Sequence, residues 1–574
     1  MNSLKSDSIG IPSLKKASGD LESNNTKKAE ILNDQFKEVF TKENTTLPPE
    51  PNCNYSTMPD FTITNNGVAK LLKDLKLHKA PGPDGIPAEI LKLAADEVAP
   101  ALGCIFQKSL DTGTLPSDWL CANVAPIFKK GDRSVASNYR PISLTSICCK
   151  TMEHIIHSNI TKHFDNLSII TNKQHGFRKQ HSCETQLILT VNDLASVLDL
   201  RSQVDMIIMD FSKAFDTVPH NRLLQKLNRY GIRNNTLTWI ANFLTHRKQR
   251  VVVGGDYSTW TEVTSGVPQG TVLGPLLFLV YINDLPDNVQ STVRLFADDC
   301  VVYRQIKNDF DQVQLQDDLN ALVKWQEDWQ MHFNPKKCFV MRLSHSGQDK
   351  LRSCDYKLGQ STLELTTSHP YLGVDITNNL SWNTHTHRIT ASANRILGFI
   401  RRNLYSCNKS TKEKAYTTLV RPKLEYSSSA WDPYTKVLTD KIEMVQRRAA
   451  RFVVNDYSRY TSVTEIMKNL KWTSLKDRRT INRLSTLHKA RLGLTALPVD
   501  DLFQPVQRLS RNNHVNSYQV IGSNKNCYKY SFIPRTIIDW NKLTYLTTTI
   551  EDVDIFKETA EIDIKPKKKQ DKKD

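Results

Sequence analysis

The sequence predicts an α+β fold whose strands are concentrated in one central region. Strand patterns cluster between residues 203 and 375, whereas helical spacing of apolar residues dominates from about 380 to 500. Residues 61 to about 200 combine short helices with loops that contain Pro and Gly. The sequence shows no repeat of fixed period, which argues against a solenoid or a propeller.

The two ends of the chain differ in composition from this central part. Residues 1–60 are rich in Ser, Asn, Lys and Pro, and apolar residues with helical spacing occur between 29 and 40. We therefore expect a tether that carries one short helix. Residues 565–574 form a Lys-rich tail, whose composition fits a nuclear-import signal and a solvated chain end equally well.

The charge balance favours a polyanionic partner. The chain has 574 residues, with 77 Lys and Arg against 60 Asp and Glu, and a formal net charge of +17. Basic proteins commonly bind nucleic acid, because each phosphate contact releases counterions. Residues 381–480 contain 20 Lys and Arg against 8 Asp and Glu, so an excess of 12 lies in the helical region. Charge alone leaves open a protein that is merely basic.

The cysteines and the apolar runs predict an intracellular protein of the nucleus or cytoplasm. None of the 11 cysteines belongs to a Cys-x-x-Cys pair, which fits neither a disulfide framework nor a zinc knuckle and indicates reduced thiols. The longest apolar run, Leu276–Ile282, is too short to span a bilayer, and the first residues lack an apolar signal core. We therefore expect no membrane partner.

A first candidate site residue follows a buried strand. The continuous apolar run from Met206 to Met209 is typical of a strand that is covered on both faces. Asp210 comes next, where this strand would reach the surface. A carboxylate at such a position either caps the following turn or binds a ligand, and capping is the commoner role for a residue considered alone.

Two adjacent acids mark a second candidate site. Asp298 and Asp299 lie between two apolar stretches, which predicts a β-hairpin with both acids in its turn. Hairpin turns prefer Asn-Gly or Asp-Gly, because their central residues often need positive φ. Two carboxylates ~4 Å apart repel by roughly 4 kcal/mol at an effective dielectric constant near 20. A divalent cation would reverse the sign of this interaction, so a metal site explains the pair better than an ordinary solvated turn does.

Three such aspartates fit the chemistry of nucleotidyl transfer. Two Mg²⁺ ions about 3.5–4 Å apart would activate a 3′-hydroxyl and stabilise the pyrophosphate leaving group. Mg²⁺ prefers carboxylate and phosphate oxygens. Asp210 and Asp298 would bridge both ions and Asp299 would assist, so that catalysis would consist mainly of positioning and electrostatic stabilisation.

Three motifs in a fixed order resemble motifs A, B and C of reverse transcriptases. They are Asp210-Phe-Ser-Lys-Ala-Phe-Asp216, Ser265-Gly-Val-Pro-Gln-Gly270 and Phe296-Ala-Asp-Asp299. The longer run of residues 265–285 is similar to the non-LTR (LINE-type) retrotransposon group, and so are residues 78–86, 138–144 and 174–178. The resemblance covers about residues 25–500.

The resemblance implies a right-hand polymerase with a ferredoxin-like (split βαβ) palm, mixed fingers and a helical thumb. It implies an RNA-directed DNA polymerase that adds deoxynucleotides to a primer 3′-hydroxyl, with an RNA template and a DNA primer as partners. The oligomeric state stays open. The expected domains are a tether at 1–60, fingers at 61–200, the palm at 201–375, the thumb at 376–500 and an accessory segment at 501–574.

The same resemblance assigns roles to single residues. Asp210, Asp298 and Asp299 would be the catalytic metal ligands for two Mg²⁺ ions, with Mn²⁺ as a substitute. Phe215 falls at the position of a bulky steric gate that clashes with a ribose 2′-hydroxyl, and otherwise it would be a core aromatic. The other expected substrate-binding residues are Arg140, Lys129, Lys130, Phe211, Gly266, Pro268, Gln269, Gly270 and Lys336.

The chemical reason for each assignment differs. Arg140 would grip the triphosphate with its planar guanidinium, helped by Lys129 or Lys130. Residues 266–270 would line the nucleotide and template pocket, where glycine lets the backbone approach a ligand closely. Lys336 or Lys337, in a segment that resembles motif D, would protonate the leaving pyrophosphate. Residues 371–374 resemble the primer-grip hairpin. Ordinary surface or turn roles stay open for all of these residues.

Other functions remain as alternatives. No endonuclease domain fits before residue 60, so the chain resembles a fragment or a truncated copy of a longer retrotransposon protein. A catalytically inactive or domesticated nucleic-acid-binding remnant would keep the basic helical region. An intron maturase would need a maturation domain and usually Tyr in place of Phe296, and an RNA-templated RNA polymerase would lack the gate at Phe215.

Overall fold

The computed structural model describes residues 10–48, 55–344, 352, 354–508 and 514–564. The Lys-rich tail at 565–574 lies outside the described residues. The chain divides into two units, one made of residues 1–177, 210–289 and 319–334 and the other of residues 178–209, 290–318 and 335–574.

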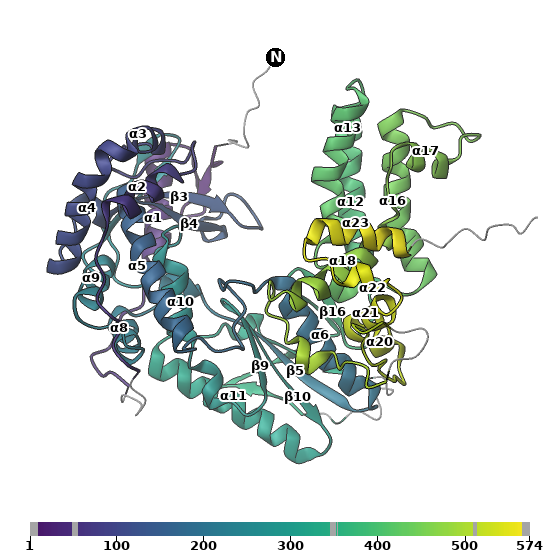
Figure 1. Cartoon of the computed structure of the whole chain (residues 1–574). Helices are drawn as coiled ribbons and strands as arrows, with labels where there is room; N and C mark the ends of the chain where they lie inside the picture. The colour runs from purple at the N-terminus through teal and green to yellow at the C-terminus, as the bar shows by residue number, and fades with distance from the viewer. Residues whose placement is uncertain (1–9, 49–54, 345–351, 353, 509–513, 565–574) are drawn as a thin grey trace, which may run out of the picture. The chain divides into compact units, whose positions relative to one another are not determined.

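The first unit is built on a mixed sheet (Figure 1). Its strand order is β4-β3-β6-β7, with β8 also paired to β6. The pair β3–β4 is antiparallel, whereas β3 and β6 run parallel, so a long crossover connects them. The strands are β3 Cys121–Phe128, β4 Tyr139–Leu144, β6 Lys248–Val253, β7 Asp256–Tyr257 and β8 Thr261–Glu262.

The helix expected between residues 29 and 40 is α1, Asn25–Lys37. It begins earlier than the apolar spacing suggested, because the Asn24 side chain accepts a hydrogen bond from the Lys27 amide and caps the helix. Leu32 and Phe36 on its inner face join one buried cluster with residues of β3 and β6. The N-terminal helix therefore belongs to the core of the sheet.

Further helices complete the first unit. They are α2 Asn65–Lys73, α3 Ala88–Leu93, α4 Ala95–Thr112, α5 Ile147–Asn166, α7 Ala214–Thr217, α8 His220–Arg229, α9 Asn234–Leu244 and α10 Leu273–Ile282. The long apolar run of the sequence is α10, which is buried on nearly every side. The buried carboxylate of Glu153 accepts hydrogen bonds from the amides of Val272 and Leu273 and so caps the start of α10. Among the described residues, no helix has the length and apolarity needed to cross a bilayer.

The second unit contains the ferredoxin-like sheet that the sequence predicted. Its strand order is β14-β11-β5-β10-β9, and the four strands β11-β5-β10-β9 reproduce the split βαβ arrangement. β11 is antiparallel to β5, and β10 is antiparallel to β9. The strands are β5 Gln203–Asp210, β9 Thr292–Phe296, β10 Asp299–Ile306, β11 Phe339–Leu343 and β14 Glu364–Leu365. Residues 203–209 of β5 are all buried, as the apolar run indicated.

Helices and a short hairpin surround this sheet. The helix α6 Cys183–Asp199 contributes Leu187 and Ile188 to the core, and the hairpin of β15 Ser368–Tyr371 and β16 Val374–Thr377 adds Tyr371 and Ile376. The helix α11, Asp309–Trp329, connects β10 to β11 and is divided between the two units.

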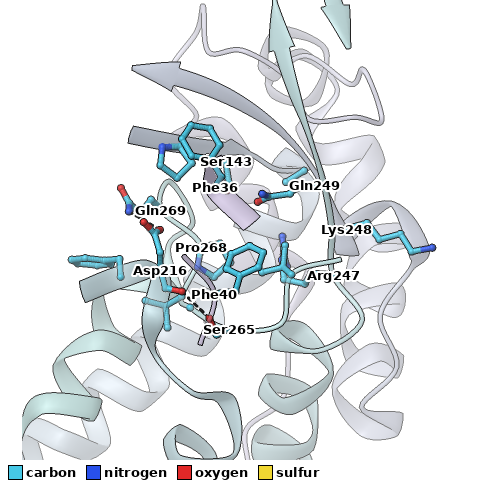
Figure 2. Close-up of a pocket in the computed structure, with 16 residues that line it drawn as sticks. Phe36, Phe40, Ser143, Asp216, Arg247, Lys248, Gln249, Ser265, Pro268 and Gln269 are labelled. Carbon is cyan, nitrogen blue, oxygen red and sulfur yellow. Dashed lines mark hydrogen bonds between the residues drawn. The ribbon is translucent and has the colours of Figure 1, made fainter. Parts of the chain in front are cut away.

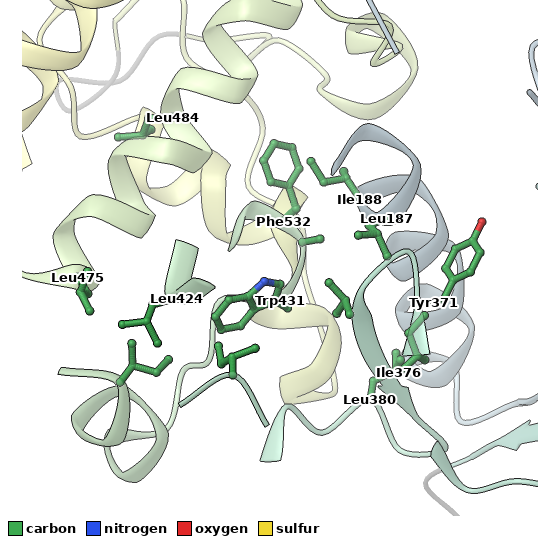
Figure 3. Close-up of a cluster of buried hydrophobic side chains, with 14 of the residues drawn as sticks. Leu187, Ile188, Tyr371, Ile376, Leu380, Leu424, Trp431, Leu475, Leu484 and Phe532 are labelled. Carbon is green, nitrogen blue, oxygen red and sulfur yellow. The ribbon is translucent and has the colours of Figure 1, made fainter. Parts of the chain in front are cut away.

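The C-terminal half of the chain is helical. Its main helices are α12 Asn383–Asn403, α13 Lys409–Ala415, α14 Arg421–Glu425, α15 Ser428–Trp431, α16 Lys436–Val454, α17 Val463–Asn469, α18 Leu475–Arg491, α21 Phe532–Trp540 and α23 Val553–Ile564. Trp431 and Phe532 lie in one hydrophobic cluster with residues of α6 and the β15–β16 hairpin (Figure 3). The His488 ring stacks on Phe556 with 4.0 Å between centroids. Residues after 501 therefore share a core with the helices before them.

Candidate active site

The two adjacent acids lie at the β9–β10 hairpin, but not both in its turn. Asp299 pairs with Phe296, so Ala297 and Asp298 are the two central turn residues and Asp299 is the first residue of β10. The positive φ of the turn, +52°, belongs to Ala297. This register corrects the expectation of an Asp-Asp turn, because neither aspartate needs the left-handed conformation. The Asp298 side chain is half-buried and Asp299 is exposed.

Asp210 is the half-buried last residue of β5, and β5 is the neighbour of β10 in the sheet. The next residue, Phe211, points into the core of the first unit, where its ring stacks on Phe333 at 4.3 Å. The Asn334 amide donates to the Asp210 carbonyl oxygen at 2.7 Å. The start of motif A is therefore anchored by the segment that precedes Lys336.

Phe215 has a ring that is partly open to solvent. It stacks on Phe278 of α10 with 4.4 Å between centroids and an interplanar angle of 17°. The Phe177 ring meets it edge-on at 6.2 Å. Two aromatic neighbours thus fix the plane of the Phe215 ring, and part of the ring stays open to solvent.

The motif B loop lies directly against motif A. The Gly266 amide donates to the Val218 carbonyl oxygen and the Val267 amide to the Phe215 carbonyl oxygen, both at 2.8 Å. The Ser265 hydroxyl donates to the Asp216 carbonyl oxygen at 2.9 Å, as the dashed line in Figure 2 shows. These bonds hold the two loops as one rigid element.

Gln269 contacts motif A through its side chain and β4 through its backbone. Its side-chain Nε2 donates to the Asp216 Oδ1 at 2.9 Å, and its carbonyl oxygen accepts from the Ser143 amide at 2.7 Å. Burial raises the pKa of Asp216 to about 6, while the hydrogen bond from Gln269 and the charges of Lys213 and Arg140 act in the opposite direction. The sequence places Asp216 within motif A but gives no sign of this role.

These residues line a small pocket in the first unit (Figure 2). Phe36 of α1, Ser143 of β4 and Arg247 before β6 complete its wall together with Asp216 and Gln269. The volume of this cavity is about 30 Å³, enough for about one water molecule. The two loops are therefore packed closely together, and the pocket between them is too small to contain a nucleotide.

The predicted cationic residues are exposed. Arg140 lies on β4, opposite Ile127 of β3, and Lys129 and Lys130 follow the end of β3. Lys336 is exposed in a single 3₁₀ turn, Pro335–Lys337, in the second unit. All four side chains can thus reach a ligand in solvent. In the part of the chain that the structure describes, no three His, Cys, Asp or Glu side chains are already gathered as a metal site.

Comparison with known proteins identifies the family that the central part of the chain matches. Residues 127–376 match the family described as reverse transcriptase (RNA-dependent DNA polymerase). The chain is 27% identical over 475 residues to the RNA-directed DNA polymerase from mobile element jockey of Drosophila melanogaster, covering 79% of this chain and 51% of that protein. It is 26% identical over 483 residues to the probable RNA-directed DNA polymerase from transposon BS of the same species, with the same coverage of 79% and 51%.

A solved structure, apo telomerase from Candida tropicalis truncated from the C-terminal domain, is also similar. It has a TM-score of 0.33 and 11% sequence identity, and the alignment covers 50% of this chain and 60% of that one. The chain spans about half the length of the curated relatives that it matches. Residues 127–376 thus form a reverse transcriptase domain, related in sequence to RNA-directed DNA polymerases of non-LTR mobile elements.

Proposed function

We propose that this chain is an RNA-directed DNA polymerase of a non-LTR retrotransposon, which adds deoxynucleotides to a primer 3′-hydroxyl on an RNA template. The observation that carries the proposal is the reverse transcriptase domain. In this domain Asp210 of motif A ends strand β5, and Asp299 of motif C begins the neighbouring strand β10. From this strand order we infer that the three aspartates act together.

Reverse transcriptases use divalent metal ions, and we propose two Mg²⁺ ions here, replaceable by Mn²⁺. Asp210, Asp298 and Asp299 would hold them, and their oxygen donors suit a hard cation. A complete set of protein ligands is not required, because Mg²⁺ is usually bound by one or two carboxylates together with substrate phosphates and water. Bound ions would supply charge stabilisation to the attacking and leaving oxygens.

The remaining residues would select and position the substrate. Phe215 would exclude ribonucleotides, Arg140 and Lys129 or Lys130 would bind the triphosphate, and Lys336 would donate a proton to pyrophosphate. Pro268, Gln269 and Gly270 would contact the nucleotide and template, with Gly266 holding their loop in place. Phe211 would contribute through its backbone, since its ring is buried.

We propose the domain order fingers 61–200, palm 201–375 and thumb 376–500, in an enzyme that works in the nucleus or the cytoplasm. The ferredoxin-like sheet supports the palm, and the helices from α12 onward support a helical thumb. The excess of 12 positive charges in residues 381–480 supports contact between the thumb and a nucleic-acid backbone.

Primer extension by the purified full chain tests the proposal. An RNA template, an annealed DNA primer, deoxynucleotides and Mg²⁺ should yield extended primers, and chelation of the metal should stop the reaction. A DNA template and ribonucleotides provide the matched comparisons. Binding of the primer–template without any extension would instead support the nucleic-acid-binding remnant.

A further inference from the structure

We propose that Asp216 is a positioning residue that fixes the orientation of the Gln269 side-chain amide toward the incoming nucleotide. The inference rests on the proposed function, since it assigns a role within the same site. Asp216 lies six residues beyond Asp210, and its Oδ1 accepts the Gln269 Nε2 hydrogen bond at 2.9 Å.

The backbone around Asp216 is already satisfied by other residues. Its carbonyl oxygen accepts from the Ser265 hydroxyl at 2.9 Å, and its amide donates to the Lys213 carbonyl oxygen at 2.8 Å. Ser265 in turn accepts from the Thr41 amide at 2.8 Å. These contacts fix the backbone from which the Asp216 carboxylate reaches Gln269 Nε2.

An ionised carboxylate decides which end of the amide faces it. Aspartate accepts hydrogen bonds and donates none, whereas a glutamine amide has a donating nitrogen and an accepting oxygen. Opposite Asp216, Gln269 must therefore present Nε2, which leaves Oε1 directed elsewhere as an acceptor. A neutral partner at position 216 would accept either orientation of the amide.

The Gln269 backbone is fixed by its contact with β4. Its carbonyl oxygen accepts from Ser143, and a Cβ atom at Gly270 would lie 2.7 Å from the Ser143 carbonyl oxygen. Rotation of the Gln269 side chain is therefore the main freedom that remains at this position. Restricting this rotation before the nucleotide binds lowers the entropic cost of binding.

The charged groups near this contact support ionisation of Asp216 at neutral pH. Lys213 on motif A and Arg140 on β4 each favour the charged carboxylate, and Arg247 and Lys248 line the same pocket. Burial opposes them and raises the pKa of the Asp216 carboxyl to about 6. Above this pH the carboxylate is acceptor-only, as the proposed role requires.

The steady-state kinetics of primer extension test the positioning role of Asp216. Four proteins are compared: the unchanged chain, Asp216→Ala, Gln269→Ala and the double variant. Asp216→Ala should raise KM for the deoxynucleotide about tenfold, the size expected when one charge-assisted hydrogen bond is lost, and should leave kcat within about twofold. In the Gln269→Ala background the same change should have little further effect. Asp256→Asn, an exposed change on β7, controls for the loss of a negative charge.

Each result has one meaning. Unchanged KM in Asp216→Ala, or fully additive effects in the double variant, would overturn the positioning role. Failure of the unchanged chain to extend any primer would instead count against the proposed function. The urea midpoints of the same four proteins then give a cycle that needs no activity: coupling supports the Asp216–Gln269 contact and additivity rejects it. If Asp216→Ala does not fold, the isosteric Asp216→Asn takes its place, with a smaller rise in KM expected.

Discussion

Gly266 lies so close to motif A that a Cβ atom there would stand 2.7 Å from the Asp216 carbonyl oxygen. The residue also has φ of +92°, a conformation that side chains disfavour. Motif B can therefore lie against motif A because position 266 carries no side chain. Gly255 offers a matched comparison, since its φ is +94° and a Cβ atom there would have no neighbouring atom within 4 Å.

Gly266→Ala should lower stability more than Gly255→Ala does. Both changes cost about 1–2 kcal/mol for the left-handed backbone, and Gly266→Ala adds the contact with the Asp216 backbone. Urea unfolding measures the difference, and primer extension should fall at least about tenfold in Gly266→Ala because the loop must move. Equal losses of stability in the two variants would show that motif B does not depend on this close approach.

Asp216→Asn should stabilise the protein at neutral pH. The pKa of Asp216 is about 6 in the folded protein and 3.8 for the free group. As pH rises from about 4 to 6, the carboxyl therefore loses its proton in the unfolded chain before it does so in the folded protein. The free energy of unfolding falls over this range. Asparagine removes that penalty, which is about 2 kcal/mol after allowance for the solvent contact that the side chain keeps. The urea midpoints of the two proteins should differ at pH 7 and agree near pH 3.5. A variant less stable at pH 7 would contradict the raised pKa.

The residues near the sheet show what the sequence could predict. The run from Met206 to Met209 predicted the buried strand that ends at Asp210, because local periodicity is enough for that inference. The apolar stretches around Asp298 predicted the hairpin for the same reason. The register of this hairpin could not be predicted in the same way, since pairing of Asp299 with Phe296 depends on the whole sheet.

Long-range contacts explain what the sequence did not reveal. Asp216 joins the candidate site through its hydrogen bond with Gln269, 53 positions later. The helix α1 belongs to the core through contact with β6, more than 200 residues away, which composition could not indicate. The metal-binding role of Asp210 remains a prediction that rests on the resemblance and on the sheet order.

Phe215→Val should let the enzyme incorporate ribonucleotides. The smaller side chain would remove the predicted clash with a 2′-hydroxyl, and discrimination against ribonucleotides should fall by about 10–100-fold, as for other steric pockets. The ratio of kcat/KM for a deoxynucleotide and its ribonucleotide measures this change. Phe278→Leu, which alters the stacking partner and leaves the Phe215 ring present, should keep most of the discrimination. A native enzyme that already accepts ribonucleotides equally well would show that Phe215 is not the gate.

Asp298→Asn should abolish synthesis without weakening primer–template binding. Loss of one proposed metal ligand is expected to lower the extension rate by at least about 10²-fold, because the proposed ions would stabilise charge in the transition state. Fluorescence anisotropy with labelled primer–template measures binding, and Asp256→Asn again controls for charge. If binding and synthesis disappeared together, Asp298 would have a structural role in place of the metal-binding role.

Arg447→Gln should reduce the salt dependence of nucleic-acid binding. Each phosphate contact contributes about −0.9 to the slope of log affinity against log salt on a DNA duplex, so loss of one contact should make the slope shallower by about that amount. Arg447 is exposed on α16, whereas Arg478 is partly buried and paired with Glu425, so Arg478→Gln should leave the slope nearly unchanged. Anisotropy titrations with salt between about 50 and 200 mM measure the slopes of the two variants. Equal slopes in Arg447→Gln and the unchanged chain would mean that Arg447 does not contact the phosphate backbone.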